Sequence, residues 1–307
     1  MPSRLSETEL LPVGLGARRS PQLVSVVVPL LNKAETLPDQ LRALEAQDYT
    51  GAWEVVIVDN GSADASVDIA ERWMKQFSRG QVVRAVDRRS PGHARNAGAA
   101  RACGDFLAFT DADDVPHTGW LTGMAEGARQ GDLVAGAIEV DGLNDARLRA
   151  WHPLSPRERA LAGYRFLSYA SGTNTGVWAD VFEHLGGFNE ESIAGEDIEF
   201  SWRAQLASYR IVSAPGAVVQ ERLRSSMGSL ASQHYRYGTT GPRLYSRFRG
   251  AGMPRTGLTK RLSAWVWILS VWPAAAWSER IRGRWTLEAS YACGRVAGSL
   301  RHRVLYI

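Results

Sequence analysis

The run Ala108-Phe109-Thr110-Asp111-Ala112-Asp113-Asp114 takes the chain from apolar residues to three carboxylates within four positions. Residues 105–109 are predicted to form a buried strand, because short apolar runs bounded by polar turn formers are typical of central parallel strands. The carboxylates then follow the carboxyl end of that strand, the edge of an open α/β sheet where ligands bind. Clustered carboxylates there suit a divalent cation that also contacts phosphate oxygens. The alternative is a helix N-cap, provided by Asp113 or Asp114 ahead of Pro116.

Two more strands and two helices are predicted in the N-terminal half. The β-branched runs 23–30 (LVSVVVPL) and 53–58 (WEVVIV) end in polar or turn-forming residues, as strands do. Apolar residues at helical spacing predict helices over 35–47 and 64–77. Strands that alternate with helices predict right-handed crossovers and a mostly parallel sheet. The sequence therefore predicts a nucleotide-binding α/β domain.

Four motifs occur in order along the first two thirds of the chain: VSVVVPLLNKAETL, EVVIVDNGSADAS, SPGHARNAGAARACGDFLAFTDADD and GEDIEFSWR. Together they resemble the inverting family 2 glycosyltransferases of GT-A fold, and the resemblance covers roughly residues 24–210. It implies a Rossmann-like domain, with a mostly parallel sheet and helices on both faces. It also implies transfer of a sugar from a nucleoside diphosphate donor to a hydroxyl group.

The resemblance places several residues beside the base and ribose of the donor. Pro29, Asn32 and Glu35 would lie in the loop after the first strand. Asp59 and Asn60 match the family's acidic pair after the second strand, where a carboxylate accepts from N3–H of the base. Asn60 departs from that pattern, because an amide oxygen accepts only a neutral, weaker hydrogen bond. The same residues also suit an ordinary Asx turn, which is compatible with the donor role.

Further matches concern the phosphates of the donor. Arg95 would flank the donor, where its planar cation suits phosphate or sugar oxygens; the alternative is a solvated arginine at a helix start. The resemblance implies that Asp113 of the Asp-x-Asp signature is the main metal ligand and that Asp111 contacts the ribose. Mn²⁺ or Mg²⁺ would stabilise the departing nucleoside diphosphate as a Lewis acid. Asp114 would support the metal site or cap a helix.

The acceptor side is assigned in the same way. Asp197, with Glu196 as the alternative, would be the general base of a single displacement, which needs no covalent nucleophile. Acidic residues in a first turn also complement the helix dipole. Asn174 lies in a matching donor or acceptor loop. Glu221 stands where relatives often carry a metal-binding histidine, and a carboxylate also suits Mn²⁺ or Mg²⁺. Residues 234–238 resemble a mobile basic segment over the pyrophosphate, or else an exposed basic helix end.

Length and composition predict one large domain with a C-terminal appendage. The 307 residues are 45% hydrophobic, which is enough for a full core. We predict a disordered tail over 1–21 without a signal peptide, a catalytic domain over 22–225 and a helical region over 226–307. Cys103 and Cys293 are far apart, which favours a reducing compartment and disfavours disulfides or zinc.

The C-terminal third is basic and rich in tryptophan. The net charge is +4, and arginines gather in this part, which favours an anionic surface as partner; nucleic acid is disfavoured because no reading motif is present. Residues 262–277 (LSAWVWILSVWPAAAW) are shorter than the roughly 20 apolar residues that span a membrane. Tryptophans with flanking arginines suit the headgroup region. The alternative is a buried helix that packs on the catalytic domain or on another subunit.

The sequence thus predicts a metal-dependent inverting glycosyltransferase of cell-envelope or exopolysaccharide glycan synthesis. Its acceptor would be lipid-linked or a polysaccharide, and the protein would be cytoplasmic, bound peripherally at the inner face of the cell membrane. Two alternatives are a catalytically weak scaffold that binds sugar nucleotides and a nucleotidyltransferase. The latter should carry a Gly-rich basic loop after the first strand, where this chain has PLLNK.

Overall fold

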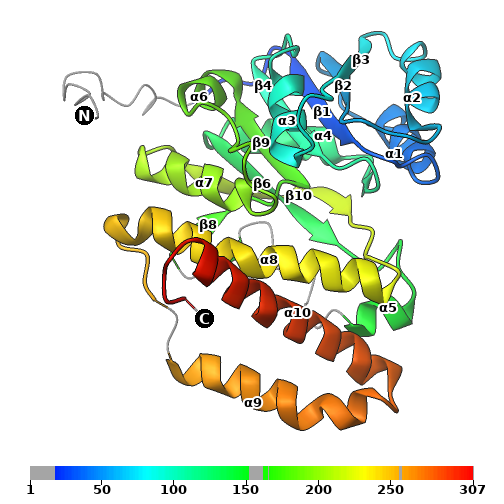
Figure 1. Cartoon of the computed structure of the whole chain (residues 1–307). Helices are drawn as coiled ribbons and strands as arrows, with labels where there is room; N and C mark the ends of the chain where they lie inside the picture. Colours follow the sequence, from blue (N-terminus) through cyan, green and yellow to red (C-terminus); the bar gives the residue numbers. More distant parts are fainter. Residues whose placement is uncertain (1–17, 152–161, 165, 256–257, 307) are drawn as a thin grey trace.

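An eight-stranded sheet forms the centre of the computed structural model, which describes residues 18–151, 162–164, 166–255 and 258–306. Its strand order is β3-β2-β1-β4-β9-β6-β10-β5 (Figure 1). The strands are β1 (Val24–Leu30), β2 (Trp53–Asp59), β3 (Gly80–Arg84), β4 (Phe106–Thr110), β5 (Val115–Pro116), β6 (Leu133–Glu139), β9 (Asn174–Trp178) and β10 (Ile211–Gln220). A separate hairpin pairs β7 (Ala162–Tyr164) with β8 (Leu167–Tyr169).

The first half of the sheet is parallel, as the alternating pattern predicted. Strand β1 runs parallel to β2 and β4, and β2 runs parallel to β3. Strand β9 is antiparallel between β4 and β6, and pairs Asn174 with Thr110. The three strands predicted at 23–30, 53–58 and 105–109 are confirmed to within one or two residues. The carboxyl ends of β1, β2 and β4 therefore meet at one edge, beside the amino end of β9.

Helices connect the strands and cover the sheet. They are α1 (Leu37–Glu45), α2 (Ser66–Met74), α3 (Pro91–Ala99), α4 (Trp120–Ala128), α5 (Ala146–Trp151), α6 (Ala179–His184), α7 (Glu196–Leu206), α8 (Met227–Phe248), α9 (Leu258–Ala275) and α10 (Glu279–Arg301). Consecutive residues 26–28 of β1 are all 0% exposed. Since successive side chains point to opposite faces, both faces of β1 are buried. Helix α3 comes close to β1 at Gly98, whose added Cβ would lie 2.4 Å from Val27 Cγ1.

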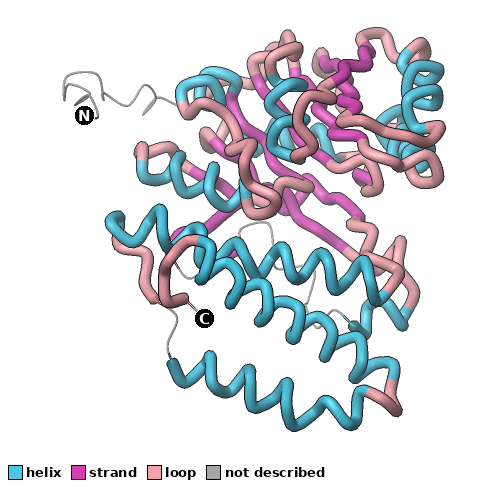
Figure 2. The backbone as a smooth tube through the Cα atoms, in the orientation of Figure 1, coloured by secondary structure: helices cyan, strands magenta, loops and turns pink. Residues whose placement is uncertain are grey.

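Three long helices follow the sheet as successive layers. Helix α10 lies between α8 and α9 (Figure 1), and Figure 2 shows the three stacked below the strands. The α8–α10 contact joins backbone to backbone: a Cβ added at Gly294 would lie 2.0 Å from the Tyr235 carbonyl oxygen, and one at Gly238 would lie 2.2 Å from that of Tyr291. Small residues at this crossing therefore fix α10 against α8. The predicted tail over 1–21 lies mostly outside the described residues.

Gly294→Ala is expected to destabilise the protein by about 1–3 kcal/mol, because overpacking forces the two helices apart. Gly228→Ala is the matched control, since a Cβ at Gly228 of α8 meets nothing within 4 Å. That change should be neutral or stabilise by up to about 1 kcal/mol. Chemical denaturation of both variants tests the close crossing. Equal stability of the two variants would contradict it.

Candidate functional site

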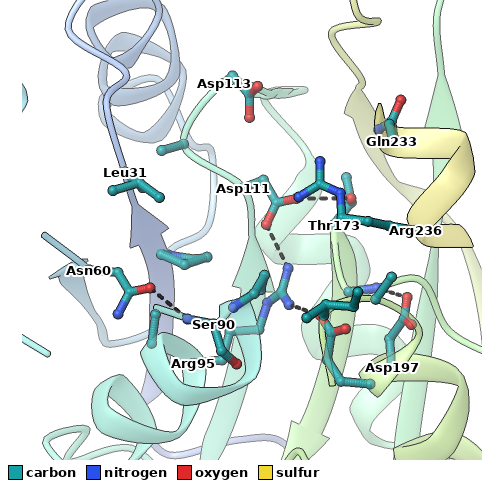
Figure 3. A pocket seen from close by; sticks show the side chains of 18 of the residues that line it. Leu31, Asn60, Ser90, Arg95, Asp111, Asp113, Thr173, Asp197, Gln233 and Arg236 are labelled. Atoms are coloured by element: carbon teal, nitrogen blue, oxygen red, sulfur yellow. Dashed lines mark hydrogen bonds and ion pairs between the residues drawn. The ribbon is translucent and has the colours of Figure 1, made fainter. Parts of the chain in front are cut away.

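A cavity of about 690 Å³ opens at the carboxyl ends of β1, β2 and β4 (Figure 3). Its walls come from the loops after these strands, the start of α3, residues 171–173, residues 193–197 and the first turns of α8. Four carboxylates line it: Asp111, Asp113, Glu196 and Asp197. The cavity therefore lies where the sequence predicted a ligand site, and it gathers acidic residues from distant parts of the chain.

Arg95 joins two of these carboxylates at the base of the cavity. Its Nη2 lies 2.7 Å from Asp111 Oδ1, and its Nη1 lies 2.7 Å from Glu196 Oε1 (Figure 3). Burial alone would lower the pKa of Arg95, which is only 4% exposed, but the charges of Asp111, Glu196 and Asp197 outweigh that effect and raise it. The alternative of a solvated surface arginine is wrong. Arg95 lines the cavity and gives two hydrogen bonds to protein carboxylates, while its predicted contact with the donor stays a prediction.

Asp113 lies at the cavity wall between two cations. Lys33 Nζ forms an ion pair with Asp113 Oδ2, and Arg224 Nη1 lies 3.6 Å from the same oxygen. Asp111 also accepts a hydrogen bond of 3.2 Å from Thr173 Oγ1. Within the described part of the chain, no three His, Cys, Asp or Glu side chains gather into a group that could hold a metal. A cation that takes one or two carboxylates and completes its shell with substrate phosphates and water still fits Asp113.

Asp114 and Glu221 lie behind this wall. Asp114 is 2% exposed, and its Oδ1 accepts a hydrogen bond of 2.9 Å from the Arg222 backbone N–H. Burial, and then the neighbouring charges of Asp111, Asp113 and Glu221, raises the pKa of Asp114 well above its ordinary value. The chain continues into β5, and α4 starts only after Gly119, so the helix-cap alternative for Asp113 and Asp114 is wrong. Glu221 does not line the cavity, and its predicted metal role stays a prediction.

The first loop contributes less to the cavity than the resemblance implied. Pro29 lines the cavity, as do Leu31 and Lys33. Asn32 adopts a left-handed φ of 52°, and its Oδ1 accepts a hydrogen bond of 2.8 Å from the Ala63 backbone N–H. Glu35 is exposed, and neither Asn32 nor Glu35 belongs to the cavity lining. Asn32 therefore ties the loops after β1 and β2 together.

The side chains of Asp59 and Asn60 form hydrogen bonds with backbone groups of the protein. Asp59 is 3% exposed and accepts a hydrogen bond of 2.8 Å from the Ser62 backbone N–H, so the predicted turn is present. Asn60 lines the cavity, donates through Nδ2 to the carbonyls of Ala85 and Arg88, and accepts through Oδ1 from Ser90 N–H at 3.0 Å. A carboxylate at position 60 could not donate these two bonds. The departure from the family pattern therefore holds the loop that leads into α3.

The start of α7 presents two carboxylates in different surroundings. Asp197 accepts hydrogen bonds of 2.8 Å from the backbone N–H groups of Gly172 and Ile198. Glu196 is 6% exposed and is bound to Arg95. Burial raises the pKa of Glu196 against the opposing effect of Arg95. Asp197 is thus oriented by backbone amides at the cavity wall, whereas Glu196 has a cationic partner already.

Asn174 lies in the core and not at the cavity. It is 0% exposed and accepts a hydrogen bond of 2.8 Å from Trp120 Nε1. Its Nδ2 donates to the carbonyls of Ala137 and Ala217, at 2.7 and 2.9 Å. The side chain therefore joins β9 to β6, β10 and α4. The predicted contact of Asn174 with a donor or acceptor is not supported.

One face of α8 closes the cavity. Residues 229, 232, 233, 236 and 237 line it, and their spacing is that of a single helix face. Arg236 points into the cavity above Asp111 (Figure 3). The segment 234–238 lies inside α8, so the alternative of a helix end is wrong. Sequence reasoning pointed to residues 234–238, of which Arg236 and Tyr237 line the cavity, but it missed Lys33, Arg224 and residues 229, 232 and 233.

Residues 25–186, more than half of the chain, match the sequence model of glycosyl transferase family 2. The chain belongs to that family. Residues 107–287 also match glycosyl transferase family group 2. The protein is therefore a glycosyltransferase, and the prediction from the four ordered motifs is confirmed.

Three comparisons illustrate the relationship. The chain is 29% identical to glycosyltransferase AglE of Haloferax volcanii over 70% of its own length and 71% of AglE. It is 33% identical to an undecaprenyl-phosphate 4-deoxy-4-formamido-L-arabinose transferase of Pseudomonas aeruginosa, over 42% of this chain and 39% of that protein. The solved mannosyltransferase PcManGT from Pyrobaculum calidifontis, in complex with GDP-Man and Mn²⁺, superposes with a TM-score of 0.60. That structure is 21% identical over 91% of this chain and 87% of PcManGT, which confirms the GT-A fold.

Proposed function

We propose that the protein is a metal-dependent inverting glycosyltransferase that moves a sugar from a nucleoside diphosphate donor to an acceptor hydroxyl. The observation that carries this proposal is the convergence of Asp111 and Asp113, after β4, and Asp197, at the start of α7, on one cavity. The volume of that cavity is ample for a sugar nucleotide. GDP-Man and Mn²⁺ in the structural neighbour PcManGT are of the same donor and cofactor class.

The donor half of the reaction belongs to Asp113 and the surrounding cations. Asp113 would hold Mn²⁺ or Mg²⁺ together with the diphosphate, and the bound cation would stabilise the charge of the leaving nucleoside diphosphate. Lys33 and Arg224 add positive charge beside Asp113, and Arg236 adds it from α8. Preorganised cations at the place where negative charge develops are a strong source of catalysis.

The acceptor half belongs to Asp197. The acceptor oxygen attacks the anomeric carbon, its proton passes to an Asp197 carboxylate oxygen, and the bond from that carbon to the diphosphate oxygen breaks. One displacement inverts the anomeric centre without a covalent sugar–enzyme bond. The backbone amides of Gly172 and Ile198 hold the carboxylate in place. Arg95 holds the carboxylates of Asp111 and Glu196 in place through two ion pairs.

The acceptor we propose is lipid-linked or a nascent polysaccharide of the cell envelope. The arabinose transferase relative is named for undecaprenyl phosphate, a lipid phosphate. None of the described helices is long and apolar enough to cross a membrane. Helix α9 nevertheless exposes Leu269 (71%) and Trp272 (63%), and Trp277 (92%) is exposed in the turn that follows it. Arg280, Arg282 and Arg284 are exposed directly after that turn, so the end of α9 and the turn suit the headgroups of an anionic bilayer.

Incubation of the purified protein with a panel of nucleoside diphosphate sugars and Mn²⁺ tests the proposed reaction. We expect nucleoside diphosphate release that requires the cation and increases when membrane lipid extract supplies acceptors. The anomeric configuration of the transferred sugar is then read by nuclear magnetic resonance. Retention of configuration, or transfer at full rate in EDTA, would contradict the proposal.

Co-sedimentation with liposomes tests whether Trp272, Trp277 and the arginines that follow them bind a membrane surface. The protein is expected to bind anionic vesicles and to be released in part by salt, because the arginine contribution is screened. The double variant Trp272→Glu and Trp277→Glu should lose most of this binding. Val86→Glu is the matched control, because Val86 is 59% exposed and lies after β3, outside the C-terminal helices. Equal binding by both variants would mean that Trp272 and Trp277 do not meet lipid.

A further inference from the structure

Helix α8 holds the turn at residues 194–195, which directly precedes the carboxylates Glu196 and Asp197 at the start of α7. Arg243 Nη2 donates hydrogen bonds to the carbonyls of Ala194 and Gly195, at 3.0 and 3.1 Å. These residues directly precede Glu196 and Asp197. The first turn of a helix takes its direction from the residue before it, so a fixed Gly195 carbonyl fixes where the following side chains point.

The same arginine is anchored in a buried charge cluster. Arg243 Nη1 lies 2.5 Å from Glu199 Oε2, and Glu199 is only 1% exposed. Asn189 donates a hydrogen bond of 2.9 Å to that oxygen, and Arg247 Nη1 lies 3.2 Å from the other one. Arg243 thus spans three acceptors on the loop and on α7 with one planar group. A lysine ammonium at that position could not reproduce the bidentate geometry.

Thr240, one helical turn before Arg243, packs on the same place. Gly195 has a left-handed φ of 72°, and a Cβ added there would lie 2.2 Å from Thr240 Cγ2. Thr240 Oγ1 also lies 3.3 Å from the Ala194 carbonyl oxygen. The turn at 194–195 is therefore enclosed by α8, the helix whose earlier residues form a cavity wall.

We propose that Arg243 is a positioning residue for the general base. It holds the turn at 194–195 so that the Asp197 carboxylate faces the acceptor side of the cavity, and it ties that orientation to the position of α8. This inference rests on the proposed function, because it assigns Asp197 as the base. Arg243 does not line the cavity, so it acts through the turn and not by touching substrate.

Steady-state kinetics of Arg243→Ala and Arg243→Lys test the proposal. Both variants should lower kcat for sugar transfer by about 10²-fold, the loss that a displacement of about 1 Å can cause. KM for the donor and the Kd for UDP or GDP should stay close to the wild-type values, because the donor wall is untouched. Arg247→Ala is the matched control: it removes a cation from Glu199 but leaves the turn held, and it should keep kcat nearly unchanged.

Each outcome decides between the alternatives. If the wild-type protein transfers no sugar, the proposed function fails and the role of Arg243 fails with it. If the wild-type protein is active and Arg243→Lys keeps its full kcat, only the positioning role is overturned. If Arg243→Ala does not fold, the Lys variant, which keeps the charge beside Glu199, decides the question. Parallel losses of kcat in the Arg243 and Arg247 variants would assign the effect to the charge cluster and overturn the positioning role.

Discussion

Asp197→Asn is expected to lower kcat by about 10²- to 10⁴-fold, the usual contribution of a positioned base, while donor binding stays nearly intact. Asparagine keeps the size of the side chain but cannot take a proton at the reaction pH. Its single amide oxygen can still accept from the backbone N–H of Gly172 or of Ile198, so the start of α7 should persist. Initial rates of transfer, together with calorimetric titration of UDP and GDP, separate the two quantities.

Glu196→Gln is the comparison that identifies the base. Glu196 is bound to Arg95 and is 6% exposed, so its loss leaves a buried guanidinium with one carboxylate fewer. Breaking a buried ion pair is strongly destabilising. We expect a lower unfolding midpoint with a smaller loss of kcat than in Asp197→Asn. The opposite order of the two kcat values would move the base to Glu196, and equal losses of binding and turnover at Asp197 would mean a structural cap.

The sequence was sufficient to predict the strand ends that carry the site. Residues 23–30, 53–58 and 105–109 are apolar except for Ser25, Glu54 and Asp105, and in a parallel sheet such runs must be buried on both faces. The residues that follow them then share one edge, whichever way the rest of the chain folds. For that reason the Asp-x-Asp segment and the cavity coincide.

Contacts between distant loops could not be predicted in the same way. Strand β9 enters the sheet antiparallel between β4 and β6, and this places residues 171–173 beside the end of β4. The pairing of Arg95 with Glu196, 101 residues apart, depends on that arrangement. No periodicity encodes it, because the direction of a short buried strand leaves no mark on its apolar pattern.

The polar residues of the motifs show a second limit to what the sequence can predict. Asn60, Asn174 and Asn32 all lie in segments that match the family, but their amides bind backbone groups of the protein. A buried amide that satisfies carbonyls looks the same in sequence as an amide that faces a ligand. Arg243 illustrates the converse, because an arginine midway along a basic helix gives no sign that it holds the turn before α7.

Asp113→Ala is expected to abolish the gain in UDP or GDP affinity that Mn²⁺ provides, because the hard cation loses its protein carboxylate. Lys33 and Arg224, which pair with Asp113 in this structure, would then be free to meet the diphosphate directly. Affinity without metal should therefore be kept or should increase. Calorimetric Kd values with Mn²⁺ and with EDTA measure both effects in one protein.

Lys33→Ala should have the opposite effects on nucleotide affinity with and without Mn²⁺, and comparing the two variants tests the metal role of Asp113. Without the ammonium of Lys33, Asp113 keeps its carboxylate for a cation, so the Mn²⁺ effect should persist while metal-free affinity falls. A nucleotide at 100 times its Kd stabilises a protein by about 2.7 kcal/mol, so thermal shifts with Mn²⁺ should survive in Lys33→Ala and shrink in Asp113→Ala. Unchanged affinity of Asp113→Ala in the presence of Mn²⁺ would remove Asp113 from the metal site. The diphosphate would then have to be held by the cations of the cavity wall alone.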